Sequence, residues 1–267
     1  MRRLHIIVLA ALVLSAALLA ASTVAGRLRQ DDTLPEIRCS EEPLTVSVQA
    51  GSDSLLEGVT AWDEKDGDLT PELLVQRIQR EEDSGRLTVT YAVADSDHHV
   101  TARSRTLIYS DYTPPRFTLS RELRYEQGAT LLVRDRLGAT DLLDGSISDR
   151  IKITATSLST NYEGIYPLTV EVSNSLGDTA SLTLDVEIRS RLAGEPIISL
   201  RTYLVYLGAG QELSALDYLA SVTGGDETAV YVTLPEGGLQ PGVNKVRYSC
   251  TGYTGVTGST IFYVIVE

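Results

Sequence analysis

The chain has 267 residues, of which 43% are hydrophobic and 22% are charged, a balance typical of globular rather than disordered proteins. Two cysteines are too few for a disulfide-rich scaffold or a four-cysteine zinc site, and three histidines leave little material for histidine-based catalysis. The net charge of −13 repels phosphate backbones, so the chain is not expected to bind nucleic acid.

A basic start and a long apolar run open the chain. Arg2 and Arg3 precede residues 6–25, which contain no charge and no proline. A helix of about twenty residues rises about 30 Å, which is the thickness of a bilayer core. We therefore predict that residues 1–30 form a membrane anchor or a signal peptide, with residues 6–25 in the membrane. A buried core helix is the remaining alternative.

Secretion stays open as an alternative to anchoring. Thr23 and Ala25 are small residues at the two positions that a signal-peptide cleavage before Gly26 requires. In both cases residues 31–267 are predicted to lie outside the cell, because the positively charged end stays in the cytoplasm. The first thirty positions hold four basic residues and no acid, so the remainder has 19 basic and 36 acidic residues, a net charge of −17.

The rest of the chain repeats about every 79 residues, because Gly85, Gly164 and Gly242 are 79 and 78 positions apart and each precedes an alternating apolar strand. A turn and a second alternating strand follow, which predicts a hairpin in each repeat. An opening strand is predicted after a proline in each repeat, at Pro35, Pro115 and Pro196.

No segment after the apolar run has the pattern of a long amphipathic helix. Short strands separated by turns predict an all-β fold, with three tandem Ig-like β-sandwich domains after an N-terminal hydrophobic helix. We call these domains module 1 (31–112), module 2 (113–190) and module 3 (195–267), of which the third has diverged most.

An acidic turn precedes the hairpin in modules 1 and 2. In module 1 it contains Asp63, Asp66 and Asp68, whose carboxylates are the hard oxygen ligands that calcium prefers. Asp and Gly also form tight turns without any metal, and the Asp68 position is Ser146 in module 2. The structural turn is therefore the favoured interpretation, and the three acids are weak calcium candidates; no other cofactor is predicted.

Three stretches resemble a known family: residues 66–70 (Asp-Gly-Asp-Leu-Thr), residues 85–95 and the inter-repeat phrase at 111–119. They are similar to the bacterial immunoglobulin-like domain first named from a pesticidal crystal protein, a relative of bacterial Ig-like and cadherin-like modules. The resemblance implies two-sheet sandwiches in extracellular multi-domain proteins, without catalytic residues. Module 1 departs from the pattern at His98 and His99, where a Gly-Asn turn is usual.

Other reactive side chains are predicted to be structural. His98 and His99 are adjacent in a turn, so they point apart and are poor ligands for one metal. Cys39 and Cys250 occupy apolar strand positions in different modules, which predicts two free core thiols rather than a disulfide. Trp62 is a candidate sugar-stacking platform, although a buried or capping aromatic side chain is the more ordinary alternative.

The predicted function follows from these features and from the absence of a nucleophile elbow, a phosphate loop or a dinucleotide fingerprint. We expect a non-catalytic bacterial cell-surface protein, an extracellular spacer or adhesion array with an unknown protein or glycan ligand. One alternative is a secreted or anchored polysaccharide-binding protein. Another is an accessory subunit of an envelope enzyme complex.

Overall fold

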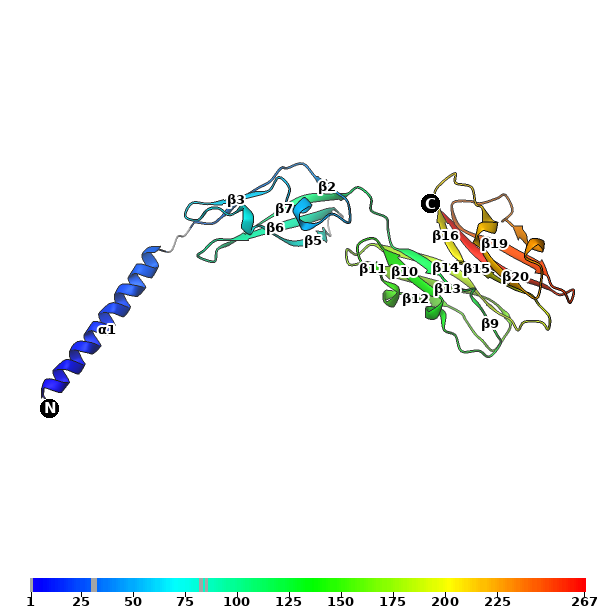
Figure 1. Cartoon of the computed structure of the whole chain (residues 1–267), viewed down its shortest axis with the longest axis horizontal. Coiled ribbons are helices and arrows are strands. Elements are labelled where there is room, and N and C mark those ends of the chain that lie inside the picture. The colour runs from blue at the N-terminus through cyan, green and yellow to red at the C-terminus, as the bar shows by residue number, and fades with distance from the viewer. Residues whose placement is uncertain (1, 30–32, 82–83, 85) are drawn as a thin grey trace. The chain divides into compact units, whose positions relative to one another are not determined.

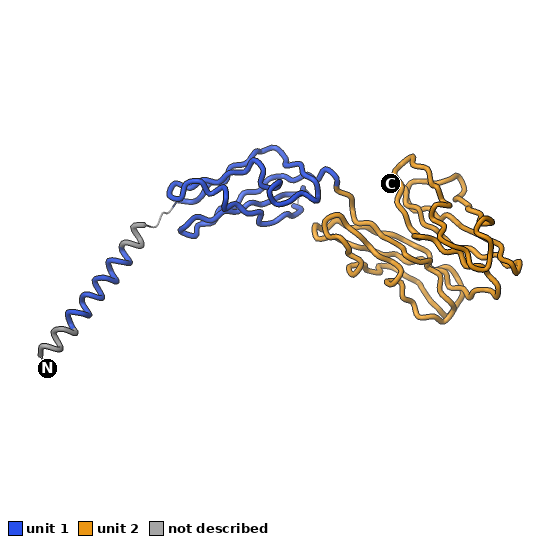
Figure 2. Tube along the Cα trace, in the orientation of Figure 1, with its two compact units in different colours: residues 1–111 blue, residues 112–267 orange. Residues whose placement is uncertain are grey.

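The computed structural model describes residues 2–29, 33–81, 84 and 86–267. Gly85 and the predicted start of module 1 at Asp31 lie outside the described residues. The chain divides into two compact units, residues 1–111 and residues 112–267, which are coloured separately in Figure 2.

The first element is helix α1 (Arg2–Arg29), which Figure 1 labels at the N-terminus. Within the residues that the structure describes, no helix is long and apolar enough to cross a membrane. The membrane segment at residues 6–25 stays a prediction.

Module 1 is a sandwich of a three-stranded and a four-stranded sheet. The small sheet has the order β1 (Glu36–Arg38), β3 (Thr60–Asp63), β4 (Gly67–Asp68). The large sheet has the order β2 (Leu44–Val46), β7 (Val100–Tyr109), β6 (Leu87–Ala94), β5 (Leu74–Arg80). A short helix, α2 (Ser52–Leu55), and a 3-10 turn, η1 (Thr70–Glu72), connect the strands.

Module 2 repeats this arrangement. Its small sheet has the order β11 (Gly145–Ser146), β10 (Leu137–Asp141), β8 (Arg116–Leu119). Its large sheet has the order β12 (Lys152–Thr156), β13 (Gly164–Ser173), β14 (Thr179–Ile188), β9 (Arg124–Tyr125). Two 3-10 turns lie between strands, η2 (Val133–Asp135) and η3 (Ser148–Arg150).

Module 3 has the same large sheet and a reduced small one. The small sheet pairs β15 (Ile197–Leu200) with β17 (Leu219–Thr223). The large sheet has the order β16 (Leu204–Leu207), β20 (Thr257–Val266), β19 (Gly242–Thr251), β18 (Tyr231–Thr233). The 3-10 turns η4 (Ala215–Tyr218) and η5 (Glu227–Ala229) complete it.

The all-β prediction of three tandem sandwiches is confirmed. Each predicted opening strand and hairpin is present, because apolar residues alternate along these strands and point into the core, as in β19, where Val246, Tyr248 and Cys250 are buried. Each module also has a parallel pair that the sequence did not predict. In it, the second strand of the module crosses to the large sheet and runs beside the last one: β2 with β7, β9 with β14, and β16 with β20.

Modules 2 and 3 share one hydrophobic core. A single cluster of buried side chains runs from Phe117 and Leu119 in module 2 to Phe262 and Val264 in module 3. Module 1 has a separate cluster that includes Tyr91. The two modules of residues 112–267 are therefore packed together as one body.

Candidate functional site

Asp63 ends strand β3 and holds the acidic turn of module 1. The residue is 2% exposed. Its Oδ1 accepts hydrogen bonds from the backbone N–H groups of Lys65 at 2.9 Å and Asp66 at 3.0 Å. An Asp side chain that binds the backbone two and three residues ahead is a common way to stabilise a tight turn. This oxygen therefore has a structural role.

Asp66 and Asp68 also bind backbone groups. Asp66 Oδ2 accepts the N–H of Ser96 at 2.7 Å, which ties the acidic turn to the turn after β6. Asp68 Oδ1 accepts the N–H of Thr70 at 3.0 Å, and hydrogen bonds from Thr70 lower the pKa of Asp68. Among the described residues, no group of three or more His, Cys, Asp or Glu is arranged to hold a metal ion. Calcium binding stays a hypothesis.

One oxygen in this turn is not satisfied. Asp63 Oδ2 is buried and has no hydrogen-bond partner in the described part of the chain. In module 2 the corresponding Asp141 Oδ2 accepts a hydrogen bond from Nδ2 of Asn174 at 3.2 Å. Asp95 is the residue of module 1 that corresponds to Asn174 of module 2, because the backbone N–H of each donates to the carbonyl oxygen of the residue four positions later. A carboxylate has no amide hydrogens to donate, so module 1 lacks this bond.

The two histidines lie in the turn after Asp95. His98 has a φ of 71° and occupies the place of Gly177 in module 2, whose φ is 82°. His99 Nδ1 lies 2.7 Å from Asp95 Oδ2. Burial by itself would raise the pKa of Asp95, but hydrogen bonds from His99 lower it. The departure from the family pattern therefore leaves a residue other than glycine in a left-handed conformation.

Trp62 is half-exposed rather than buried, with 53% of its surface accessible. Burial is wrong because β3 alternates, and its neighbours Ala61 and Asp63 point inward. The ring lies beside Gly67 of the acidic turn, as a capping side chain would. Trp62 pairs with Glu36 on β1 and Asp68 on β4, so its ring has acidic neighbours on both flanking strands.

Both cysteines are free, but only one is a full core residue. Cys250 is 1% exposed and fills the position that Val93 and Val172 occupy in the other modules, as predicted. Cys39 is only half-buried, because it follows the last residue of β1 instead of lying within the strand.

A buried cluster of charges joins module 2 to module 3. The carboxylate of Glu195 accepts hydrogen bonds from Arg124 Nη1 at 2.8 Å and Nη2 at 3.3 Å. Arg189 Nη2 binds the same carboxylate at 2.8 Å, and the N–H of Leu192 binds it at 3.0 Å. Burial by itself would raise the pKa of Glu195, but the bonds from Arg124 and Leu192 and the charges of Arg124 and Arg189 lower it to about 2.

A second carboxylate extends the cluster. Glu122 of module 2 forms an ion pair with Arg191 of the inter-module linker. The other oxygen of Glu122 accepts a hydrogen bond from the hydroxyl of Thr260 in module 3, at 3.0 Å. One side chain therefore binds both the linker and the next module.

Tyrosines of module 3 bind the backbone of module 2. Tyr206 Oη accepts the N–H of Phe117 at 2.8 Å, and Tyr263 Oη accepts the N–H of Asp185 at 3.0 Å. Burial raises the pKa of Tyr206 and of Tyr263. These hydrogen bonds are directional, so they help to fix how the modules pack.

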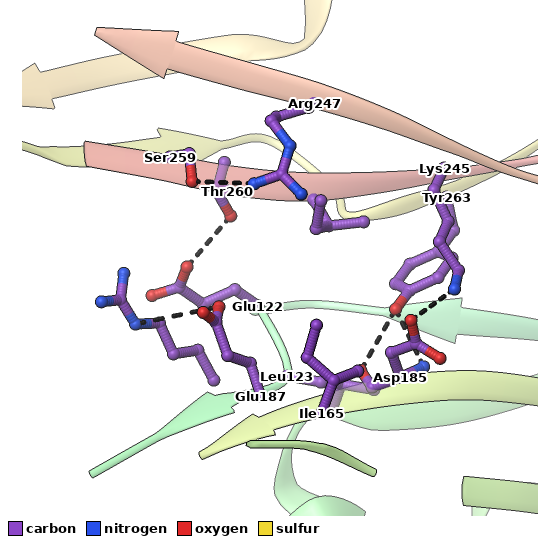
Figure 3. Close-up of a pocket in the computed structure, with 12 residues that line it drawn as sticks. Glu122, Leu123, Ile165, Asp185, Glu187, Lys245, Arg247, Ser259, Thr260 and Tyr263 are labelled. Carbon is purple, nitrogen blue, oxygen red and sulfur yellow. Dashed lines mark hydrogen bonds and ion pairs between the residues drawn. The ribbon is translucent and has the colours of Figure 1, made fainter. Parts of the chain in front are cut away.

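A cavity of about 140 Å³ lies beside these contacts, as Figure 3 shows. Asp185 and Glu187 of β14 face Lys245 and Arg247 of β19 across it. Lys245 forms an ion pair with Asp185, and Arg247 donates a hydrogen bond to Ser259 at 3.2 Å. The lining groups are engaged with one another, as is typical of a polar contact between domains.

The sequence did not predict this junction, because strand alternation is a local property of each repeat and carries no information on how two repeats pack. A usable signal was the choice of basic residue. Only Lys65, Lys152 and Lys245 among the 23 basic residues are lysines. Arginine presents a planar fork that binds a carboxylate through two hydrogen bonds, as Arg124 does here.

No protein-family model matches the sequence, and no curated protein sequence is significantly similar to it. Among solved structures, Drosophila N-cadherin EC1-3 is 12% identical, with 89% of this chain and 91% of that chain covered and a TM-score of 0.30. The extracellular domain of protocadherin GammaB4 is 12% identical over 89% of this chain, with a TM-score of 0.22.

A third similar structure is CBM51-2 in complex with GlcNAc and INT domains from Clostridium perfringens ZmpB. It is 19% identical over 58% of this chain, with a TM-score of 0.23. The chain spans only 41% of that structure's length and 52% of the protocadherin's. The sheets described above, rather than these low scores, establish the β-sandwich fold of the chain.

Proposed function

We propose that the chain is a non-catalytic bacterial cell-surface protein whose Ig-like modules form an extracellular spacer and adhesion array. The observation that supports this most directly is the junction of modules 2 and 3. Their shared apolar cluster and the buried Arg124–Glu195 ion pair make residues 112–267 one body. A spacer needs such a junction, because independent modules on a free linker would bend toward the surface.

In this proposal residues 6–25 anchor the chain as a single membrane pass, and residues 31–267 lie outside the cell. The basic pair Arg2 and Arg3 before the apolar run supports that orientation. Protease added to intact cells should then digest residues 31–267 and spare the N-terminus. A protected chain would contradict the proposal, and a mature N-terminus at Gly26 would favour secretion.

The spacer role has a direct test. An epitope tag at the C-terminus of the full chain should be accessible to antibody on intact cells. Deletion of residues 112–267 should reduce that access, and an unrelated rigid β-sandwich pair of the same length should restore it. Equal access after the deletion would contradict a spacer role. A partner captured from envelope extracts only with the native modules would indicate specific adhesion, and a captured enzyme would indicate an accessory subunit.

The exposure of Trp62 supports polysaccharide binding as a second candidate. An exposed indole ring beside acidic residues can stack on the face of a sugar. On a glycan array, Trp62→Ala should then abolish binding by residues 31–267. Tyr231→Ala, which removes an exposed aromatic side chain of module 3, is the matched control and should leave binding unchanged. Equal effects of both substitutions would exclude a platform at Trp62.

A further inference from the structure

A larger cavity, about 560 Å³, lies between modules 2 and 3. It is lined by residues 120–122 and 124–126 after β8, by Arg136 and by β15 of module 3. Pockets for small ligands typically measure about 300–1,000 Å³. We refer to this cavity as the arginine groove, because four arginines and two glutamates supply all of its charged lining: Arg121, Arg124, Arg136, Arg191, Glu122 and Glu126.

Two of these arginines are neutralised by the junction. Arg124 binds Glu195, and Arg191 binds Glu122. Arg121 and Arg136, in contrast, have no ion-pair partner among the described residues. Glu126 offsets one of these two charges, so the arginine groove keeps a net charge of about +1, in a chain whose remainder after position 30 carries a net charge of −17.

Arg136 is held in a fixed orientation. Its guanidinium lies 3.8 Å from the centroid of the Tyr125 ring. Its Nη1 donates hydrogen bonds to the carbonyl oxygens of Glu122 at 2.5 Å and Arg124 at 2.8 Å. Within the described part of the chain, Nε and Nη2 have no such partner. These two nitrogens form the side of the planar fork that binds both oxygens of a carboxylate or phosphate.

We propose that the arginine groove binds a small organic anion, a sugar-sized ligand that carries a carboxylate or a phosphate. The Nε–Nη2 side of Arg136 binds the anionic group, and Arg121 supplies the second positive charge. Leu132 and Ile197, which are partly exposed at the groove, contact the carbon atoms of the ligand. Because Arg136 is already immobilised, little conformational entropy is lost on binding. This site does not depend on the spacer role.

Titrations of the full chain with glucuronate, glucose 6-phosphate and glucose test the proposal. Calorimetry or chemical-shift changes should show saturable binding of at least one anion and none of neutral glucose. Binding of glucuronate alone or of the phosphate alone would support the site and identify its ligand chemistry. Failure of both anions to bind at about 10 mM, or equal binding of glucose, would overturn the proposal.

Variants locate the site. Arg121→Gln removes an exposed charge that has no hydrogen bond or ion pair within the described chain, and it should weaken anion binding about tenfold, as expected for loss of one charge-assisted contact. Arg134→Gln is the matched control: it removes an exposed arginine of the same module that does not line the groove, and it should have no effect. Equal affinities of the two variants would overturn the assignment.

Discussion

Arg124 of module 2 and Glu195 at the start of module 3 form a two-pronged ion pair, and their side chains are only 4% and 0% exposed. They are 71 positions apart in the sequence. A buried pair of this kind adds little net stability compared with apolar residues, because both charges lose their hydration. Its hydrogen bonds are directional, however, so it fixes the orientation of one module on the other.

Replacing Glu195 with Gln should strongly destabilise residues 112–267. The substitution leaves buried Arg124 with only Glu187, 4.0 Å from its Nε, as an ion-pair partner, and breaking a buried pair costs about 3–5 kcal/mol. Denaturant unfolding monitored by tyrosine fluorescence would measure the loss. Lys245→Gln, which breaks the more exposed ion pair with Asp185, should cost less than about 1 kcal/mol. Similar losses in both variants would contradict the prediction.

The same carboxylate predicts a pH dependence. The pKa of Glu195 falls from its ordinary value of 4.5 to about 2 in the folded chain. A lowered pKa stabilises the fold above the unfolded value, and this contribution disappears as the pH falls from 4.5 toward 2. We expect a loss of about 3 kcal/mol over that interval. Glu195→Gln should lack this component. If the unfolding free energies of variant and wild type fell in parallel between pH 4.5 and pH 2, the prediction would be contradicted.

Replacing Asp95 with Asn should change the stability of module 1 by less than about 1 kcal/mol, because the new amide can donate to the unsatisfied Asp63 Oδ2 but the ion pair with His99 Nδ1 is lost. Thermal melting of the full chain would measure the change. The reciprocal change in module 2, Asn174→Asp, removes the bond to Asp141 and should destabilise that module.

The same thermal melting, repeated with calcium, distinguishes a purely structural acidic turn from a calcium site. If Asp63, Asp66 and Asp68 only form a turn, millimolar calcium should leave the melting temperature of the wild type unchanged. A rise of several degrees that a chelator reverses, and that Asp95→Asn removes, would show that calcium occupies the space beside Asp63 Oδ2.

Glycine at position 98 should be more favourable than histidine. A left-handed conformation costs an L-residue roughly 1–2 kcal/mol, while glycine loses about 0.5–1 kcal/mol more backbone entropy on folding. His98→Gly should therefore raise the unfolding free energy of module 1 by up to about 1 kcal/mol. His98→Ala retains the strain and should give no gain, whereas Gly177→Ala should destabilise module 2. A gain with alanine equal to that with glycine would refute this explanation.

The two thiols should react at different rates. Half-buried Cys39 should react with a thiol reagent in the folded chain before buried Cys250, and both should react fully after denaturation. Cys250→Val should change the stability by less than about 1.5 kcal/mol, because valine fills this position in the other modules. A large loss of stability on reduction would mean that the cysteines are not free.

Much of the fold could be predicted, but the site only in part. The strands around Tyr91, Leu168 and Tyr248 were predictable because alternation in the sequence specifies which side chains face the core. The Asp63 turn was predictable for the same local reason. The missing hydrogen bond of Asp63 Oδ2 was not predictable, since it depends on which residue of the following hairpin lies opposite this oxygen in the folded module.

The all-β class, the repeat and the faces of the hairpin strands follow from the amino-acid sequence alone. The physical reason is that the period of two is a local property of extended backbone. The packing of module 2 on module 3 brings Arg124 to Glu195, places Tyr206 on the backbone of module 2 and gathers four arginines along one groove. These contacts depend on how two finished sandwiches pack, and no local pattern in either repeat encodes that packing.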